Sequence, residues 1–236
     1  RDSIGTFTDD MGIVKYASNN VPRFNHNPAT GECLGLLIEE GRTNLLTYSN
    51  LTSGEGIGTG YANGGTTVYK GSNATAPDGT LTAWNSVYNG TSGDSSLYKA
   101  GGEITTTNST SYTLSVFAKV PSTNTYITGI RLRTFNSNHD GGFNLLTGTV
   151  LATAEGTTTN RIEAYSNGWY RCSITFTSGT DGNQGVQFYL INNASTALNS
   201  SSADGEELYL WGAQLEQGSF PTSYIPTSGS TVTRAQ

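Results

Sequence analysis

The chain has 236 residues and a formal net charge of −6, with 30 glycines and only 13% charged residues. The acidic balance argues against nucleic-acid binding, which needs a clustered basic surface, and no apolar run is long enough for membrane insertion. The composition is poor in the residues that build long helices and rich in Gly, Ser, Thr and Asn, so it favours many short strands joined by turns.

Residues 1–45 are predicted to form an extended N-terminal arm that ends in a first buried strand. Short extended pieces alternate with turns over residues 5–24, and they are too polar to make a core alone. The apolar run 34–38 is typical of a buried strand. We therefore expect the arm to lie against the body of the protein or against a partner subunit. Arg1 in place of an initiator Met predicts a processed product or a piece of a longer protein.

Residues 46–226 are predicted to fold as an all-β, antiparallel jelly-roll β-sandwich. Alternation of apolar and polar residues with period two defines the strands, and turn clusters separate most of them. The predicted strands are 81–88, 95–100, 111–119, 126–135, 143–151, 161–165, 168–177, 185–191 and 206–215. Residues 50–65 are predicted to be an exposed loop, and residues 227–236 to be the start of a linker or of a truncated following segment.

The side of these strands that faces away from the core has an unusual composition. Strand 168–177 directs Cys172 and Ile174 to one side and Trp169 and Arg171 to the other, because side chains on a strand alternate sides. The same pattern on the other strands adds further rings, guanidinium groups and amides. The full set predicted to face away from the core is Phe117, Arg131, Arg133, Trp169, Arg171, Gln187, Tyr189, Tyr209 and Trp211.

Rings and guanidinium groups on one face suit a glycan, because rings stack on the C–H faces of sugars while Arg and Gln bond the hydroxyls. An acidic host surface polysaccharide would suit the arginines, since a guanidinium holds a carboxylate bidentately. The alternative is a purely structural spacer or capsid decoration, with the same face covered by residues 1–45, by the second sheet or by a neighbouring subunit. Tyr209 and Trp211 are the two that we most expect to be core. The predicted glycan-binding residues are Arg131, Arg133, Trp169, Arg171, Gln187 and Tyr189.

The sequence contains no convincing catalytic motif, and we predict that the protein is not an enzyme. His26 and His139 lie in turn-like sequence, and no Gly-x-Ser-x-Gly occurs. A polysaccharide depolymerase is a further alternative, because two acids at a suitable separation can form a glycosidase pair. The acids considered for this are Glu39, Glu40, Glu206, Glu207 and Glu216.

We expect no cofactor, although jelly-roll modules often bind one structural Ca²⁺. Glu39, Glu40 and Glu216 would be the Ca²⁺ candidates, and solvated acids are the preferred interpretation. Cys33 and Cys172 are predicted to be two buried free thiols, because a chain of this size needs no disulfide framework and no metal-ligand spacing is present.

The stretch Val21–Leu46 (VPRFNHNPATGECLGLLIEEGRTNLL) resembles a segment of tailed-phage virion proteins, especially tail fibres and other surface appendages. Asn167–Phe176, Leu210–Glu216 and Phe220–Thr227 are similar to the jelly-roll half of the same proteins. The resemblance implies a concanavalin-A-like or carbohydrate-binding-module-like sandwich on the virion surface, as one piece of a longer polypeptide among other virion proteins. It brings no catalytic motif. Three-fold assembly is common in phage fibres, so a homotrimer is the expectation by analogy.

Overall fold

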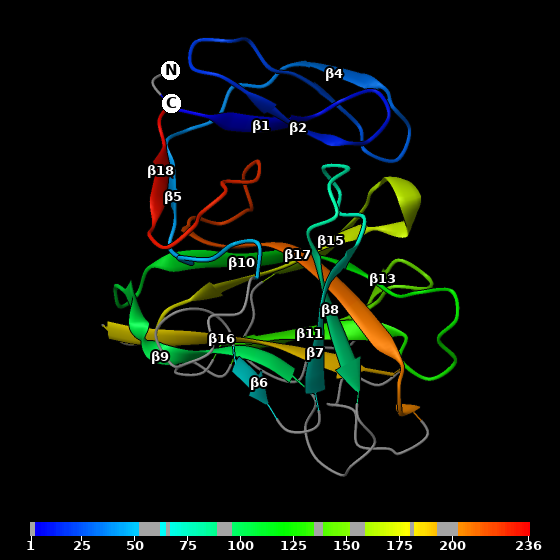
Figure 1. The fold of residues 1–236 in the computed structure, drawn as a ribbon. Coiled ribbons are helices and arrows are strands. Elements are labelled where there is room, and N and C mark those ends of the chain that lie inside the picture. The colour runs from blue at the N-terminus through cyan, green and yellow to red at the C-terminus, as the bar shows by residue number, and fades with distance from the viewer. Residues whose placement is uncertain are drawn as a thin grey trace.

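Two six-stranded antiparallel sheets form the body of the protein, and a smaller layer of hairpins covers one of them (Figure 1). Successive strands often change sheet, which makes the body an antiparallel jelly-roll β-sandwich, as the sequence predicts. The described residues form no α-helix, and none of them builds a helix long and apolar enough to cross a membrane. The computed structural model describes residues 3–51, 62–64, 67–88, 96–134, 139–151, 159–179, 182–192 and 203–236.

We call the sheet beneath the hairpins sheet I and the opposite sheet sheet II. Sheet I has the strand order β14-β15-β10-β17-β8-β7, and sheet II the order β13-β12-β11-β16-β9-β6. The strands of sheet I are β7 Thr67–Ala74, β8 Ala83–Tyr88, β10 Ser111–Lys119, β14 Thr159–Ala164, β15 Tyr170–Thr177 and β17 Glu207–Gln217. The strands of sheet II are β6 Ala62–Gly64, β9 Ser96–Thr106, β11 Gly129–Thr134, β12 Asp140–Asn144, β13 Thr149–Val150 and β16 Gly182–Ile191.

Two details of the strands differ from the sequence prediction. The predicted strand 143–151 is divided into β12 and β13 by a turn at residues 145–148. The predicted loop 50–65 lies mostly outside the described residues, and its residues 62–64 form the short strand β6.

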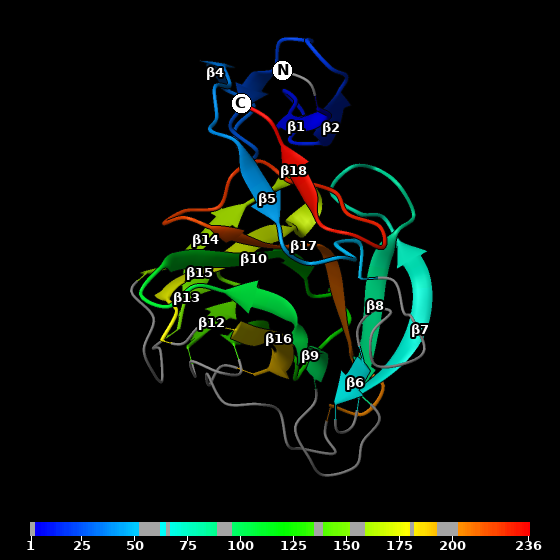
Figure 2. The same cartoon turned by 90° about the vertical axis from the view of Figure 1, so that its left-hand side faces the viewer.

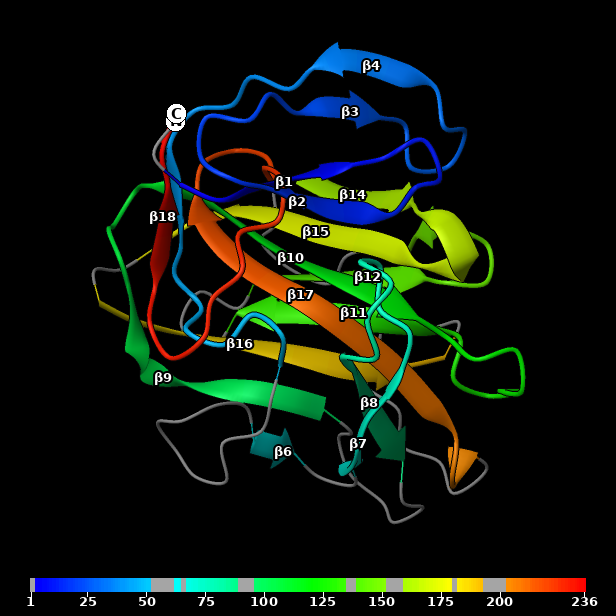
Figure 3. The ribbon, with the colours of Figure 1, turned by 45° about the horizontal axis from the view of Figure 1, so that its top comes forward.

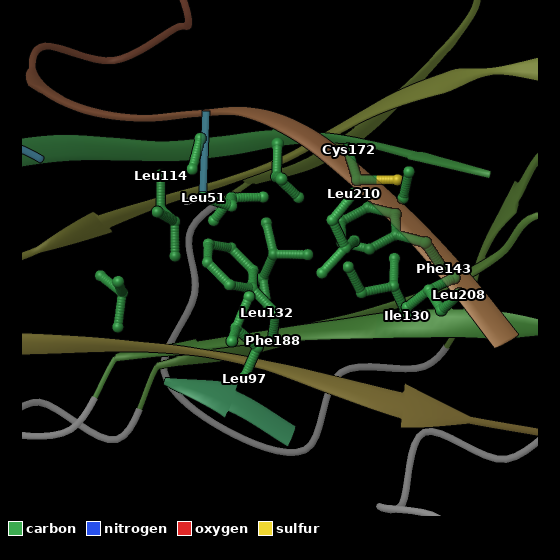
Figure 4. Packing of buried hydrophobic residues seen from close by; sticks show 14 of the residues in the cluster. Leu51, Leu97, Leu114, Ile130, Leu132, Phe143, Cys172, Phe188, Leu208 and Leu210 are labelled. Carbon is green, nitrogen blue, oxygen red and sulfur yellow. The ribbon is translucent and has the colours of Figure 1, made fainter. Parts of the chain in front are cut away.

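The main core lies between the two sheets and is built from the inward side of the predicted alternation (Figure 4). Leu114 and Cys172 of sheet I and Leu132 and Phe188 of sheet II are among its fully buried members. The alternation in β17 changes at Gly212, which takes a φ of 65° next to a register shift between β10 and β17. Such a bulge re-aims the chain, so residues on both sides of Gly212 contribute to the core while its neighbour Trp211 faces the hairpins.

The predicted arm is a packed layer of two hairpins that lies across sheet I (Figure 3). β1 Gly5–Thr8 pairs with β2 Val14–Ala17, and β3 Phe24–His26 pairs with β4 Cys33–Leu36. A second cluster of buried apolar side chains fills the space between the hairpins and sheet I. Its members are Val14, Ala76, Ala83, Phe117, Trp169, Trp211 and Tyr224.

A separate two-stranded sheet joins the hairpin layer to the sandwich (Figure 2). In it, β5 Arg42–Asn44 pairs with β18 Val232–Arg234. Within the predicted linker segment 227–236, residues Val232–Arg234 form β18 of this sheet. Arg234 is 0% exposed, and its guanidinium donates to the backbone oxygens of Ser223 and Glu40.

The apolar run 34–38, predicted to be a buried strand, is exposed. Leu34, Leu36 and Ile38 are exposed by 60%, 53% and 78%, because β4 pairs only with β3 at the outside of the hairpin layer. A short apolar run has no signal that separates a core strand from an outer hairpin. The prediction for Cys33, which lies on the same strand, is wrong for the same reason, whereas Cys172 is buried as predicted.

Candidate functional site

The six predicted glycan-binding residues do not share one face of the molecule. Trp169 and Arg171 lie next to or on β15 and face outward from sheet I, whereas the other four lie on β11 and β16 of sheet II. The alternation of a strand shows which side chains leave the core. It does not show which of the two sheets the strand joins. The prediction therefore placed residues of two opposite outer faces on a single face.

The outer face of sheet I is covered by the hairpins together with residues around Thr75 and Tyr224. Trp169 is only 2% exposed, and its indole N–H donates to the backbone oxygen of Thr75 at 3.1 Å. The ring of Trp211 lies 5.4 Å from that of Phe117 and 4.5 Å from that of Tyr224. The alternative of a covered face therefore describes the predicted residues on sheet I. Of the two residues most expected to be core, Trp211 lies in this cluster and Tyr209 is partly buried against it.

The outer face of sheet II carries a row of linked polar side chains that crosses β12, β11, β16 and β9. Arg131 forms an ion pair with Asp140, and its guanidinium carbon lies 5.5 Å from the centre of the Tyr189 ring. The Tyr189 hydroxyl donates to Gln187 Oε1 at 2.7 Å, and Gln187 Nε2 donates to Ser96 Oγ at 2.7 Å. Because Arg131 and Tyr189 are register partners, strand pairing itself brings them together.

This polar row has its geometry fixed before any ligand arrives. Each side chain is held by a neighbour, which lowers the conformational entropy that binding would cost. Tyr189 is only 5% exposed, and the Arg131 guanidinium lies over its ring. Gln187 and Ser96 are 8% and 0% exposed, so most of the row is buried. The half-buried Arg133, which is the register partner of Gln187, is more accessible.

The acids considered for catalysis or for Ca²⁺ serve as anchors in the structure. Glu39 accepts a hydrogen bond from Arg23 at 2.7 Å and lies 3.3 Å from Arg234. Burial works to raise the pKa of Glu39, but Arg234, Ser223 and Arg23 outweigh it and hold the pKa below its ordinary value. Glu216, predicted to be solvated, is instead fully buried and accepts bonds from the backbone N–H and the hydroxyl of Thr222.

The remaining polar candidates are also bound to the chain. Glu206 accepts from the backbone N–H groups of Thr125 and Ile127; burial opposes its ionisation, but these bonds prevail and lower its pKa. His26 and His139 each contact a backbone oxygen. In the part of the chain that the structure describes, no three His, Cys, Asp or Glu side chains gather in a way that could hold a metal ion.

Buried polar residues of Val21–Leu46 and Leu210–Glu216 hold the layers together, a role that was not predicted from the sequence. Asn44 donates to the backbone oxygens of Ala213 and Ile225 and accepts from the N–H of Leu215. Gln214 Oε1 accepts from the N–H of Ile225 at 2.7 Å. The sequence did carry a signal for this role, namely a polar residue such as Gln214 within a mostly apolar strand. Such a residue needs a hydrogen-bond partner when it is buried.

No protein-family model and no curated protein matches the chain. Among solved structures, the fold is similar to the CBM22-1 xylan-binding domain of Paenibacillus barcinonensis Xyn10C, with 9% identity over 78% of this chain and 100% of that chain and a TM-score of 0.45. It is also similar to the CBM22-1-GH10 modules of Clostridium thermocellum xylanase 10B, with 11% identity, 80% and 30% coverage and a TM-score of 0.42.

A third similar structure is the enzymatically active domain of bacteriophage CBA120 tailspike protein 4, with 10% identity over 67% of this chain and 19% of that chain and a TM-score of 0.36. Because no identity among the three exceeds 11% and no TM-score exceeds 0.45, we do not infer a ligand from them.

Proposed function

We propose that this chain is a non-catalytic polysaccharide-binding module on the surface of a tailed-phage particle, where it contacts host glycans. The observation that supports this function is the polar row on sheet II, in which Arg131, Tyr189 and Gln187 are linked side chain to side chain. Arg133 and Arg131, which are the half-buried side chains of this face, would contact sugar hydroxyls and carboxylates. The arginines favour an acidic polysaccharide, because each guanidinium forms charge-assisted hydrogen bonds with a carboxylate.

The virion location is supported by the sequence resemblance of Val21–Leu46 and of the C-terminal stretches to tail-fibre proteins. In the structure these stretches are joined: Arg23 and Glu39 of the first form an ion pair, and Ser223 of the last donates to Glu39. The proposal also includes assembly as a homotrimer, by analogy with phage fibres. Other virion proteins are further proposed partners.

A purely structural module is the second candidate. It is favoured by the covering of Trp169 and Trp211, which places large aromatic surface inside the protein rather than toward a ligand. In that case the polar row on sheet II would only stabilise the sheet.

Affinity electrophoresis through gels that contain acidic or neutral capsular polysaccharides separates the two candidates. The wild-type chain should be retarded by an acidic polysaccharide, and Arg133→Gln should weaken the binding by about tenfold, the loss of one charge-assisted bond. Lys15→Gln is the matched control, because it removes the same charge from the exposed side of the hairpin layer. Retardation by no glycan would favour the structural module. New reducing ends in the polysaccharide would contradict the non-catalytic assignment.

A further inference from the structure

A cavity of about 200 Å³ lies between the hairpin layer and the outer face of sheet I. Figure 3 shows β1 and β2 crossing over β14 and β15 in this region. The walls combine apolar side chains, among them Phe7 and Leu37, with polar ones, among them Thr8, Asn25 and Tyr165. The volume is many times the space that one water needs, so the cavity has room for a small organic molecule.

Arg171 lines this cavity and is the unusual member of its wall. It is only 6% exposed, and its Nε–H has no hydrogen-bond partner among the residues that the structure describes. The groups that contact its guanidinium are neutral: Ser115 Oγ at 3.2 Å, the Tyr165 hydroxyl, and the Phe117 ring, whose centre lies 5.3 Å from the guanidinium carbon.

Other buried arginines of the described chain have a carboxylate partner. Arg23 and Arg234 share Glu39, and Arg131 has Asp140. Arg171 forms no ion pair with any described residue. A buried charge without a counter-charge is costly, because the lost hydration is not replaced. The geometry therefore leaves one positive charge available beside an empty volume.

The acids around the cavity are engaged with other cations. Glu163 is the register partner of Arg171 on β14, but its carboxylate lies toward Arg161, with a contact of 3.5 Å. Glu39, on the opposite wall, is bound by Arg23 and Arg234. Arg161 is largely exposed and would attract an anion toward the cavity. Burial above all raises the pKa of Tyr165, which keeps its hydroxyl protonated at neutral pH.

We propose that this cavity binds the carboxylate of a hexuronate, with the Arg171 guanidinium as its counter-charge and the hydroxyl and amide groups of the wall as partners for the sugar hydroxyls. The inference rests on the proposed function in one respect, namely that the hexuronate belongs to the acidic polysaccharide. It assigns the hexuronate to a place distinct from the polar row of sheet II.

Calorimetric titration of the full chain with D-glucuronate, D-glucose and acetate tests the proposal. The wild-type chain should bind glucuronate, bind acetate more weakly because acetate lacks the ring hydroxyls, and not bind glucose. Arg171→Met should weaken glucuronate binding by at least tenfold. Arg171→Lys is the second variant, and it should bind more weakly than wild type because lysine lacks the planar fork. Glu163→Gln should bind glucuronate two- to threefold more tightly, since it removes the nearest negative charge.

Three results would overturn the inference: no binding of glucuronate by the wild-type chain, equal binding by Arg171→Met, or weaker binding by Glu163→Gln. Arg133→Gln separates this inference from the proposed function, because it should weaken polysaccharide binding and leave glucuronate binding unchanged. If the polysaccharide is not bound but glucuronate binding depends on Arg171, the proposed function fails and the cavity assignment stands. If the polysaccharide is bound and Arg171→Met has no effect on glucuronate binding, the cavity assignment fails and the proposed function stands.

Discussion

The two outer faces of the sandwich use the same kinds of side chain in opposite ways. On sheet I, Trp169 and Trp211 pack into a second core together with Val14 of the hairpin layer, Ala76 and Tyr224. On sheet II, the Arg131 guanidinium lies over the Tyr189 ring, and the Tyr189 hydroxyl bonds Gln187, so these side chains form a linked polar row. An aromatic or arginine residue on the non-core side of a strand is therefore ambiguous until the layer above that strand is known.

The largest effect should come from removing the acid that joins the hairpin layer to the C-terminal residues. Glu39→Gln leaves Arg23 and Arg234 buried without a counter-charge, so we expect a loss of about 3–5 kcal/mol in the free energy of unfolding. Chemical denaturation measures it. Glu163→Gln is the control, because Glu163 is partly exposed, and it should change stability by less than about 1 kcal/mol. Equal effects of the two variants would show that the hairpin layer is not held by this cluster.

The covered face should respond to a smaller aromatic ring. Trp169→Phe removes part of a buried ring and the bond to Thr75, and should cost about 1–3 kcal/mol of stability without changing the affinity for polysaccharide. Unfolding curves and affinity gels together test this. The matched change Phe220→Leu, at a half-exposed ring, should leave both properties nearly unchanged. A stable Trp169→Phe variant with weakened glycan binding would mean that this face is open.

Acid should weaken the protein through the same cluster. The pKa of Glu39 is lower in the folded than in the unfolded chain, so its ionised form stabilises the fold at neutral pH and this contribution is lost as the pH falls, from about pH 5 toward 3. Urea midpoints at several pH values should fall across this range in the wild-type chain. The fall should be smaller in Glu39→Gln, and an identical slope in both would assign the acid sensitivity to other groups.

The polar row of sheet II should tolerate change better than either core. Tyr189→Phe removes the bond to Gln187 Oε1 and should cost about 1 kcal/mol of stability. We also expect a fewfold loss of polysaccharide affinity, because Gln187 is then less well oriented. Unchanged affinity together with the loss in stability would support the purely structural interpretation of this face.

The smallest effect is expected when the two cysteines of the native chain are labelled with a thiol reagent. Cys33 lies on the exposed β4, whereas Cys172 is fully buried and burial raises the pKa of its thiol well above the ordinary value. A thiol reagent should therefore label one cysteine in the native chain and two after denaturation. Rapid labelling of both in the native chain would contradict the packing of the main core.

The sandwich could be predicted because strand alternation is a local property. Leu114, Cys172 and Phe188 face the core as the alternation in their strands predicts. Gly, Asn and Pro mark the turns between the strands. Coverage by residues 1–45 was only one of several alternatives open from the sequence, because the contacts of the hairpin layer join residues far apart in the chain. The bond from Thr6 to the backbone of Tyr224, for example, links positions 218 residues apart.

The candidate site could be predicted only in part, again because it depends on contacts between residues far apart in the sequence. The residue types were identified, but the assignment of β15 to sheet I and of β11 and β16 to sheet II depends on long-range strand pairing. The polarity of Gln214 and Glu216 was visible in the sequence. Their role as hydrogen-bond anchors for residues 222–225 could be recognised only from the three-dimensional structure.

Titration of one acidic polysaccharide against Arg133→Gln and Trp169→Phe tests most directly whether the two outer faces have different roles. We predict that Arg133→Gln weakens binding by about tenfold while Trp169→Phe stays within about twofold of the wild-type dissociation constant. Weaker binding by Trp169→Phe with no change in Arg133→Gln would contradict the assignment of the polysaccharide contact to the polar row of sheet II.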